Sequence, residues 1–317
     1  MLAAKLKVTN PLLVILGPTA SGKTRLAVSI SAALGAEIIS ADSRQVFREM
    51  NIGTGKDLSE YNHHGFNVPY HLIDIKNAGE RYHVDEFKND FYDVFQTIIS
   101  AGKLPVLCGG TGMYIHSVLQ NHAYTSIPID VELRNRLYSK TSQELNAILN
   151  TFPDKSTKHA DRSTDKRLVR AIEVATFLSL NELEIVQRPE IMPYVIGLFN
   201  DVSIRREKIN ERLERRLDEG MIEEVVALLN SGVSAEMLSF YGLEYKIVVS
   251  YLKHEVSYAY MKTQLYNGIC QYAKRQMTFF RKMEKDGVNI HWYQADIDPE
   301  KLFGQVLEDI KAEFFPL

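Results

Sequence analysis

Short apolar runs alternate with amphipathic stretches along most of the chain. Six of these runs have the length of strands and carry few charges. This is typical of strands in a parallel sheet that helices cover on both faces. We expect these strands at Leu12–Leu16, Glu37–Ala41, His71–Ile75, Leu104–Leu107, Tyr194–Phe199 and Ile290–Tyr293.

Helical periodicity fills the stretches between the strands. Apolar residues recur at three- and four-residue steps from Asp85 to Ala101, and Gly102 follows as a helix stop. Thr164 and Asp298 are N-cap candidates for two further helices. We also expect two long helices, one from Ser203 to Leu229 and one from Ser257 to Lys285.

This β–α alternation predicts an α/β fold with a mostly parallel sheet and helices on both faces. The pattern changes near residue 126, and from there to residue 184 only short helical patterns occur. We therefore expect a core domain made of residues 1–125 and 185–317, and an all-helical insertion domain made of residues 126–184.

Composition limits the class of protein. Hydrophobic residues make up 45% of the 317 residues and charged residues 24%, as in a globular protein. No stretch approaches the roughly 20 apolar residues of a membrane span, and no signal peptide is expected. Cys108 and Cys270 lack metal-like spacing, which favours plain thiols in a reducing cytoplasm. A net charge of −3 means that any polyanion must bind a local basic patch.

The first apolar run leads into a phosphate-binding motif. The next eight residues fit G-x-x-x-x-G-K-[ST], and helical periodicity follows at once, so the fold is expected to be P-loop NTPase-like. Glycines let backbone N–H groups line a concavity at a helix N-terminus, lysine adds a charge, and threonine can ligate Mg²⁺. The motif residues are Gly17, Pro18, Thr19, Ala20, Ser21, Gly22, Lys23 and Thr24.

Polar residues at the ends of neighbouring strands could complete a site. Ligands of such folds bind beyond the carboxyl ends of the strands, where we expect Asp42 and Thr111. Asp42 could be a Mg²⁺ ligand, a general base or only a backbone cap. Asp74 is its rival, because it follows a strand pattern that resembles a Walker-B motif. Gly109–Gly112 form a second glycine-rich turn.

Basic residues gather in residues 155–170, 205–216 and 274–285. Such stretches are often only solvated helix faces. Arg205, Arg212 and Arg216 are nevertheless seven and four residues apart, so they share one helix face. Aromatic residues nearby could stack on bases, although core packing is the expected role of most of them.

An ordered set of motifs resembles the tRNA dimethylallyltransferase (tRNA isopentenyltransferase) family. The phosphate loop is followed by Ile39–Phe47 (ISADSRQVF) and Met50–Thr54 (MNIGT). Gly109–Tyr114 (GGTGMY), Asp165–Val174 (DKRLVRAIEV) and Lys274–Arg281 (KRQMTFFR) complete the set. The resemblance spans nearly the whole chain and departs from the family pattern by about one missing helical turn after Arg216.

The resemblance implies transfer of a dimethylallyl group from dimethylallyl diphosphate to N6 of adenosine 37 in tRNA. An exocyclic adenine amine is a poor nucleophile, so a base must take its proton, and Asp42 matches the family's base. Lys23, the loop amides, Mg²⁺ at Thr24 and Arg216 would stabilise the leaving diphosphate. Arg216 matches the last arginine of the family's R-x₅-R-x₃-R pattern.

The resemblance also implies contacts with the anticodon stem-loop, which the helical insertion would grip while the target base leaves its stack. We expect a cytoplasmic monomer without membrane contact. The expected RNA-binding residues are Asp42, Ser43, Arg44, Gln45, Thr111, Arg134, Lys166, Arg167, Leu168, Val169 and Arg170.

Three alternatives remain open at this stage. A nucleoside or nucleotide kinase would use the same loop for ATP and Asp42 to deprotonate a hydroxyl. An NTP-gated RNA-binding switch would leave its RNA covalently unchanged. A prenyltransferase acting on free adenine nucleotides would not need the basic insertion.

Overall fold

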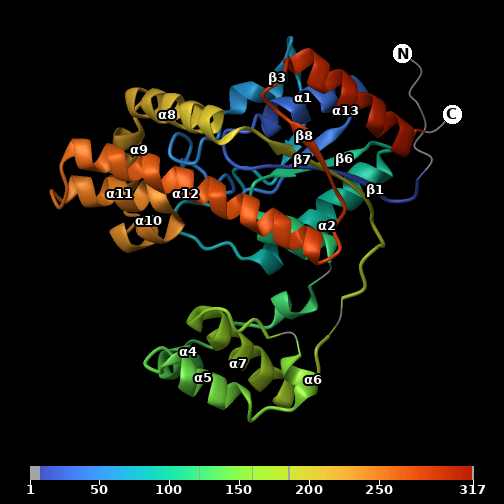
Figure 1. The fold of residues 1–317 in the computed structure, drawn as a ribbon. Coiled ribbons are helices and arrows are strands. Elements are labelled where there is room, and N and C mark those ends of the chain that lie inside the picture. The colour runs from blue at the N-terminus through green and yellow to red at the C-terminus, as the bar shows by residue number, and fades with distance from the viewer. Residues whose placement is uncertain (1–7, 121, 159, 185, 316–317) are drawn as a thin grey trace. The chain divides into compact units, whose positions relative to one another are not determined.

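The computed structural model describes residues 8–120, 122–158, 160–184 and 186–315. The chain divides into two compact units. One comprises Met1–Gln120 and Pro189–Leu317, and the other comprises Asn121–Arg188. The larger unit holds the sheet and the smaller one is helical (Figure 1).

The larger unit is built on a six-stranded sheet in the order β5-β2-β6-β1-β7-β8, and every pairing in it is parallel. The central strand β1 is wholly buried, as its run of Leu, Val and Ile predicts. Leu13 of β1 faces Val106 on one side and Tyr194 on the other. The strands are β1 (Pro11–Leu16), β2 (Glu37–Ser40), β5 (Tyr70–His71), β6 (Pro105–Gly109), β7 (Met192–Phe199) and β8 (Ile290–Gln294).

Helices cover both faces of this sheet, which confirms the predicted fold class (Figure 1). Side chains alternate along β1, so Leu13 and Ile15 pack with α1 and α13, whereas Leu12, Val14 and Leu16 pack with α2, α3 and α12. These helices are α1 (Lys23–Leu34), α2 (Val84–Ser100), α3 (Gly112–Leu119), α12 (Tyr258–Lys285) and α13 (Pro299–Phe314).

A group of helices after β7 extends the second face. It is formed by α8 (Val202–Asp218), α9 (Met221–Asn230), α10 (Ala235–Tyr241) and α11 (Leu243–Leu252), which pack into the same core as α12. A 3₁₀ helix η1 (Leu58–Tyr61) and a short hairpin of β3 (Asn62–His63) and β4 (Phe66–Asn67) lie before β5.

Two predicted elements were wrong in extent. The helix expected from Ser203 to Leu229 breaks at Gly220, whose φ of 101° is left-handed, and becomes α8 and α9. The strand expected at His71–Ile75 is only two residues long. Leu72 and Asp74 have φ values of 60° and 56°, which turn the chain toward residues 45 and 46. Helices α10 and α11 were not predicted.

The smaller unit contains α4 (Val131–Leu137), α5 (Ser142–Leu149), α6 (Asp154–Thr157), α7 (Asp165–Leu180) and the 3₁₀ helix η2 (Ala123–Ser126). The described residues of this unit contain no strand. The predicted cap is confirmed, because the Thr164 hydroxyl accepts a hydrogen bond from the Arg167 N–H. Apolar side chains of α4, α5 and α7 form its separate core.

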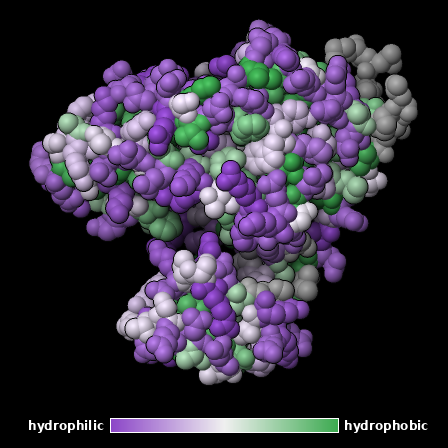
Figure 2. Space-filling model, viewed as in Figure 1, coloured by the Kyte–Doolittle hydropathy of each residue, from purple (hydrophilic) through white to green (hydrophobic). Residues whose placement is uncertain are grey.

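Hydrophilic residues dominate the face in Figure 2, and hydrophobic ones form only small groups there. None of the described helices has the length and apolarity that crossing a bilayer requires. At the sheet edge, the Glu37 carboxylate pairs with Lys103 Nζ at 2.6 Å and His71 Nε2 at 2.7 Å.

Candidate active site

The phosphate loop joins β1 to α1 within six residues. Ala20 and Gly22 have φ values of 62° and 81°, which fold the backbone back on itself. A Cβ on Gly17 would lie 2.7 Å from Ser21 Oγ, so glycine permits the tight turn. Gly22 is the N-cap of α1 and offers no side-chain hydrogen bond, so the N–H groups of the first turn remain available to an anion.

A cavity of about 530 Å³ lies beyond the carboxyl ends of β1, β2 and β6. It brings together sequence-predicted residues from four separate segments of the larger unit. Those that line it are Thr19, Lys23, Thr24, Asp42, Ser43, Arg44, Gln45, Thr111 and Arg216. The other residues of the phosphate loop shape its backbone without lining the cavity.

Asp42 is half-buried at the wall of this cavity. Its Oδ1 accepts hydrogen bonds from the N–H groups of Arg44 (2.9 Å) and Gln45 (3.3 Å). Asp42 therefore caps the turn at residues 43–46, whereas the sequence suggested a helix N-cap. The cap uses only Oδ1, and the described residues provide no hydrogen bond to Oδ2. Asp42 can therefore cap the backbone and also act as a base.

The second glycine-rich turn interlocks with the Asp42 segment. A Cβ on Gly109 would lie 2.2 Å from the carbonyl oxygen of Ala41, so only glycine permits this approach. The Thr111 N–H donates to the same carbonyl at 3.1 Å, and Thr111 Oγ1 accepts from the Ser43 N–H at 3.1 Å. Thr111 thus holds the backbone on both sides of Asp42.

A cluster of cations faces the phosphate loop across the cavity. Arg212 and Arg216 stand one turn apart on α8, and Arg212 Nη2 donates to the Gly55 carbonyl at 3.0 Å. Burial, together with Arg212, lowers the pKa of Arg216 to about 10. Burial also lowers the pKa of Lys23.

Arg216 has an unusual environment for a charged group. Only 8% of its surface is exposed, and the described residues provide it with no hydrogen bond or ion pair. Gly55, with a φ of 65°, lies against it, and a Cβ there would be 1.5 Å from Arg216 Nη2. The Glu244 carboxylate lines the same cavity and favours the charged form of Arg216, but it makes no ion pair with it. The guanidinium N–H groups of this buried cation therefore remain available to a bound anion.

Glu224 of α9 holds the loop that carries Gly55, and sequence reasoning missed it. Its carboxylate accepts hydrogen bonds from the N–H groups of Asn51 (2.7 Å), Ile52 (2.7 Å) and Gly53 (3.0 Å), and from the Tyr245 hydroxyl (2.8 Å). Nothing in the sequence shows that these N–H groups lack partners in a helix or sheet, so only the folded chain identifies their acceptor.

One face of α12 also lines the cavity, whereas the sequence indicated only a basic segment with aromatic residues that could stack on bases. Tyr272, Arg275, Gln276 and Phe279 follow each other at helical spacing within or beside the KRQMTFFR motif. The ring of Phe279 packs on Gly112, where a Cβ would lie 2.3 Å from it. This periodicity was the signal that could have found them.

Asp74 does not belong to this cavity, so the Walker-B interpretation of it was wrong. Its Oδ1 accepts a hydrogen bond from Nζ of Lys56, a buried lysine that also donates to the Phe47 carbonyl at 2.6 Å. Asp74 therefore neutralises a buried charge in the core of the larger unit.

The remaining predicted site residues lie in the helical unit. Arg134 and Arg170 both pair with Glu173, whose side chain is only 2% exposed. Leu168 and Val169 are buried in the core of this unit, whereas Lys166 and Arg167 are exposed. Contact of these six residues with RNA stays a prediction.

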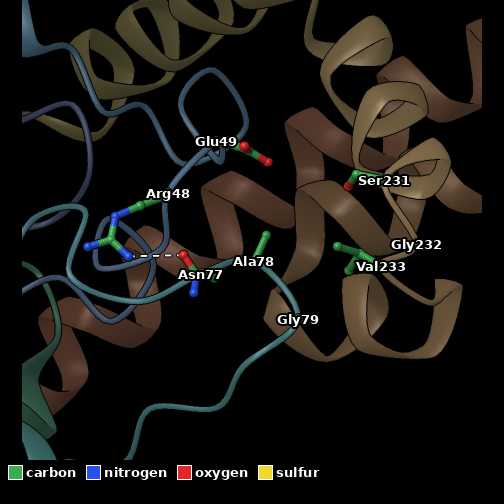
Figure 3. A pocket seen from close by; sticks show the side chains of 8 residues that line it. All are labelled: Arg48, Glu49, Asn77, Ala78, Gly79, Ser231, Gly232 and Val233. Carbon is green, nitrogen blue, oxygen red and sulfur yellow. Dashed lines mark hydrogen bonds between the residues drawn. The ribbon is translucent and has the colours of Figure 1, made fainter.

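A second hollow of about 360 Å³ lies elsewhere in the larger unit (Figure 3). Arg48 and Asn77, joined by a 3.0 Å hydrogen bond, form one side, and Ser231 and Val233 form the other. It contains neither the phosphate loop nor Asp42, so the chemistry belongs to the larger cavity.

Parallel strands, with a phosphate loop and a cluster of cations around one cavity at their carboxyl ends, define a protein of the P-loop class. Comparison of the sequence with models of known families identifies the family within this class. The IPP transferase model matches residues 45–283, and the isopentenyl transferase model matches residues 10–64. The chain therefore belongs to the IPP transferase family.

Individual relatives agree with this membership. tRNA dimethylallyltransferase 1 of Parabacteroides distasonis is 47% identical over 92% of this chain and 94% of its own. A solved tRNA isopentenylpyrophosphate transferase from Bacillus halodurans is 30% identical, covers 96% of this chain and 97% of its own, and has a TM-score of 0.72. A eukaryotic dimethylallyltransferase acting on tRNA is 20% identical, with a TM-score of 0.75, and matches in fold over 96% of this chain and 78% of its own.

Proposed function

We propose that this protein transfers a dimethylallyl group from dimethylallyl diphosphate to N6 of adenosine 37 in tRNA and releases diphosphate. Its family and the names of its relatives support transfer to tRNA. The observation that carries the proposal is the cavity itself. A phosphate loop, the buried Arg216, the partly buried Arg212, and the carboxylates of Asp42 and Glu244 line a common space of about 530 Å³.

The cations of this cavity fit the leaving group. Lys23 and Arg216 are desolvated, which lowers the pKa of each and makes their charges costly. A bound diphosphate would relieve that cost and would gain hydrogen bonds from the first-turn amides of α1. Because negative charge grows on the diphosphate as the allylic C–O bond breaks, these donors stabilise the transition state more than the ground state.

Asp42 is the proposed base. The lone pair of the adenine amine is delocalised into the ring, so C–N bond formation requires removal of an N6 proton. Asp42 Oδ1 is held by two backbone N–H groups, which leaves Oδ2 as the proton acceptor. The reaction then balances: the N6–carbon bond forms, the allylic carbon–oxygen bond breaks, diphosphate leaves, and the N6 proton moves to Asp42.

Mg²⁺ is the proposed cofactor. The described residues contain no cluster of three His, Cys, Asp or Glu side chains that could hold a metal alone. Mg²⁺ is commonly bound by few protein oxygens together with substrate phosphates and water, and the Thr24 hydroxyl beside the loop fits such a set. When bound, Mg²⁺ supplies charge neutralisation to the diphosphate.

The RNA would be held by both units. Adenosine 37 lies in a single-stranded loop, so it can leave its stack at modest cost and enter the cavity. We propose contacts from Asp42–Gln45 and Thr111 of the larger unit. The helical unit would grip the anticodon stem through Arg134 and Lys166–Arg170. We further propose that the protein acts as a cytoplasmic monomer.

The test is mass spectrometry of nuclease digests of unmodified tRNA after incubation with protein, Mg²⁺ and dimethylallyl diphosphate. We expect a dimethylallyl mass increment on adenosine 37. An unchanged adenosine would refute the proposal. A parallel reaction with ATP and small nucleosides tests the kinase alternative, for which phosphoryl transfer would be the positive result.

A further inference from the structure

A buried glutamine joins the two glycine-rich loops of the cavity. Gln276 Oε1 accepts a hydrogen bond from the Thr19 N–H at 2.8 Å, and its Nε2 donates to the carbonyl oxygen of Gly110 at 2.9 Å. Only 7% of Gln276 is exposed. The side chain therefore bridges segments that are 257 and 166 residues away in the sequence.

The second loop is shaped to receive this amide. A Cβ on Gly110 would lie 2.3 Å from Gln276 Nε2, so the contact requires glycine there. The bridge also requires one donor and one acceptor at the end of a long side chain. A carboxylate cannot donate to the Gly110 carbonyl. A thioether cannot donate there either, and it is a poor acceptor for the Thr19 N–H.

The bridge continues from Gly110 to Asp42. Thr111, the next residue, donates its N–H to the Ala41 carbonyl, and its hydroxyl accepts from the Ser43 N–H. These contacts hold the residues on either side of Asp42. A single series of hydrogen bonds thus runs from the phosphate loop through Gln276 and Thr111 to the Asp42 segment.

We propose that Gln276 is a positioning residue that sets the separation between the phosphate loop and Asp42. This inference rests on the proposed function, in which the loop holds the leaving diphosphate and Asp42 receives the N6 proton. Gln276 acts through Thr19 and Gly110. Its loss should therefore slow the chemical step more than it weakens binding of either partner, because misplacement by about 1 Å can cost 10²-fold in rate.

The test uses Gln276→Met, which keeps the length of the side chain and removes both hydrogen bonds. The single-turnover rate is measured with tRNA and saturating dimethylallyl diphosphate. Affinities for inorganic pyrophosphate and for an anticodon stem-loop RNA are titrated separately. We expect the rate to fall by about 10- to 100-fold and both affinities to stay within about threefold. Gln271→Met, at an exposed position of the same helix, is the control and should leave the rate unchanged.

Gly110→Ala provides a second route to the same link, and it carries the test if Gln276→Met does not fold. Its methyl group would displace the Gln276 amide, so we expect a similar loss of rate. Because both substitutions break one link, the double variant should be no slower than the slower single variant. Losses that multiply would overturn the inference.

The wild-type protein separates the two possible failures. Without wild-type transfer to tRNA, the proposed function itself fails. With wild-type transfer, an unchanged rate in Gln276→Met or Gly110→Ala would overturn the positioning role. A loss of RNA affinity in parallel with the rate would also overturn it, because that result would indicate direct RNA contact.

Discussion

Gly55 provides the sharpest test of the cation cluster. A Cβ at this position would lie 1.5 Å from Arg216 Nη2 and 2.3 Å from Arg212 Nη2. Ordinary contact needs about 3.5 Å, so in Gly55→Ala the Arg216 guanidinium must move by about 2 Å. A displacement of that size abolishes a hydrogen bond to the leaving group. Loss of one such donor costs about 10²–10³ in rate, or about 3–4 kcal/mol of transition-state stabilisation.

A matched control isolates this displacement from backbone strain. Gly35 has the same φ of 65°, but no atom lies within 4 Å of a Cβ placed on it. Gly35→Ala and Gly55→Ala should therefore both lose about 1–2 kcal/mol of stability through left-handed strain, measured by urea unfolding. Only Gly55→Ala should slow single-turnover prenyl transfer. Equal transfer rates in the two variants would refute the role of Arg216.

Three further predictions test other parts of the molecule. Asp42→Asn keeps the backbone cap but cannot act as a base, so turnover should fall about 10²–10⁴-fold while RNA affinity stays unchanged. Equal losses of turnover and RNA affinity would contradict the role of Asp42 as base. Glu224→Ala leaves four donors without their acceptor and should lower the free energy of unfolding by about 2–4 kcal/mol. Glu223→Ala, at an exposed position of the same helix, should not lower it. Similar values for both variants would be inconsistent with this network. Burial raises the pKa of Glu37, but hydrogen bonds from its lysine and histidine partners outweigh burial and lower it below 4.5. The stabilisation by ionised Glu37 is present above pH 4.5 and is lost as pH falls through its folded-state pKa. Glu37→Gln should therefore flatten the fall of the free energy of unfolding with acid. An unchanged slope in urea titrations between pH 5 and 3 would oppose this assignment.

Local features of this protein could be predicted from the sequence. The phosphate loop occupies eight consecutive residues between a strand and a helix, so its conformation follows from nearby glycines and the helix N-terminus. The Thr164 cap and the order of strands and helices also follow from local periodicity. Asp42 and Thr111 could be placed together because parallel strands end at one edge of the sheet.

Long-range pairing was decided only by the tertiary structure. Asp74 and Asp42 both lie at the ends of strand-like runs. Buried Lys56 forms an ion pair with Asp74, whereas Asp42 lines the cavity. Likewise, the charge run at residues 155–170 suggested a basic surface, but the fold pairs Arg170 of that run with buried Glu173, which also pairs with Arg134.

Gln276 and Glu224 show the same limit most clearly. Each completes a loop that lies more than 160 residues away in sequence, and nothing in its own neighbourhood specifies that partner. Periodicity determines which face of a helix is buried, because side chains repeat every 3.6 residues. Which acceptor meets which distant N–H depends on how the elements pack, and only the folded chain determines that.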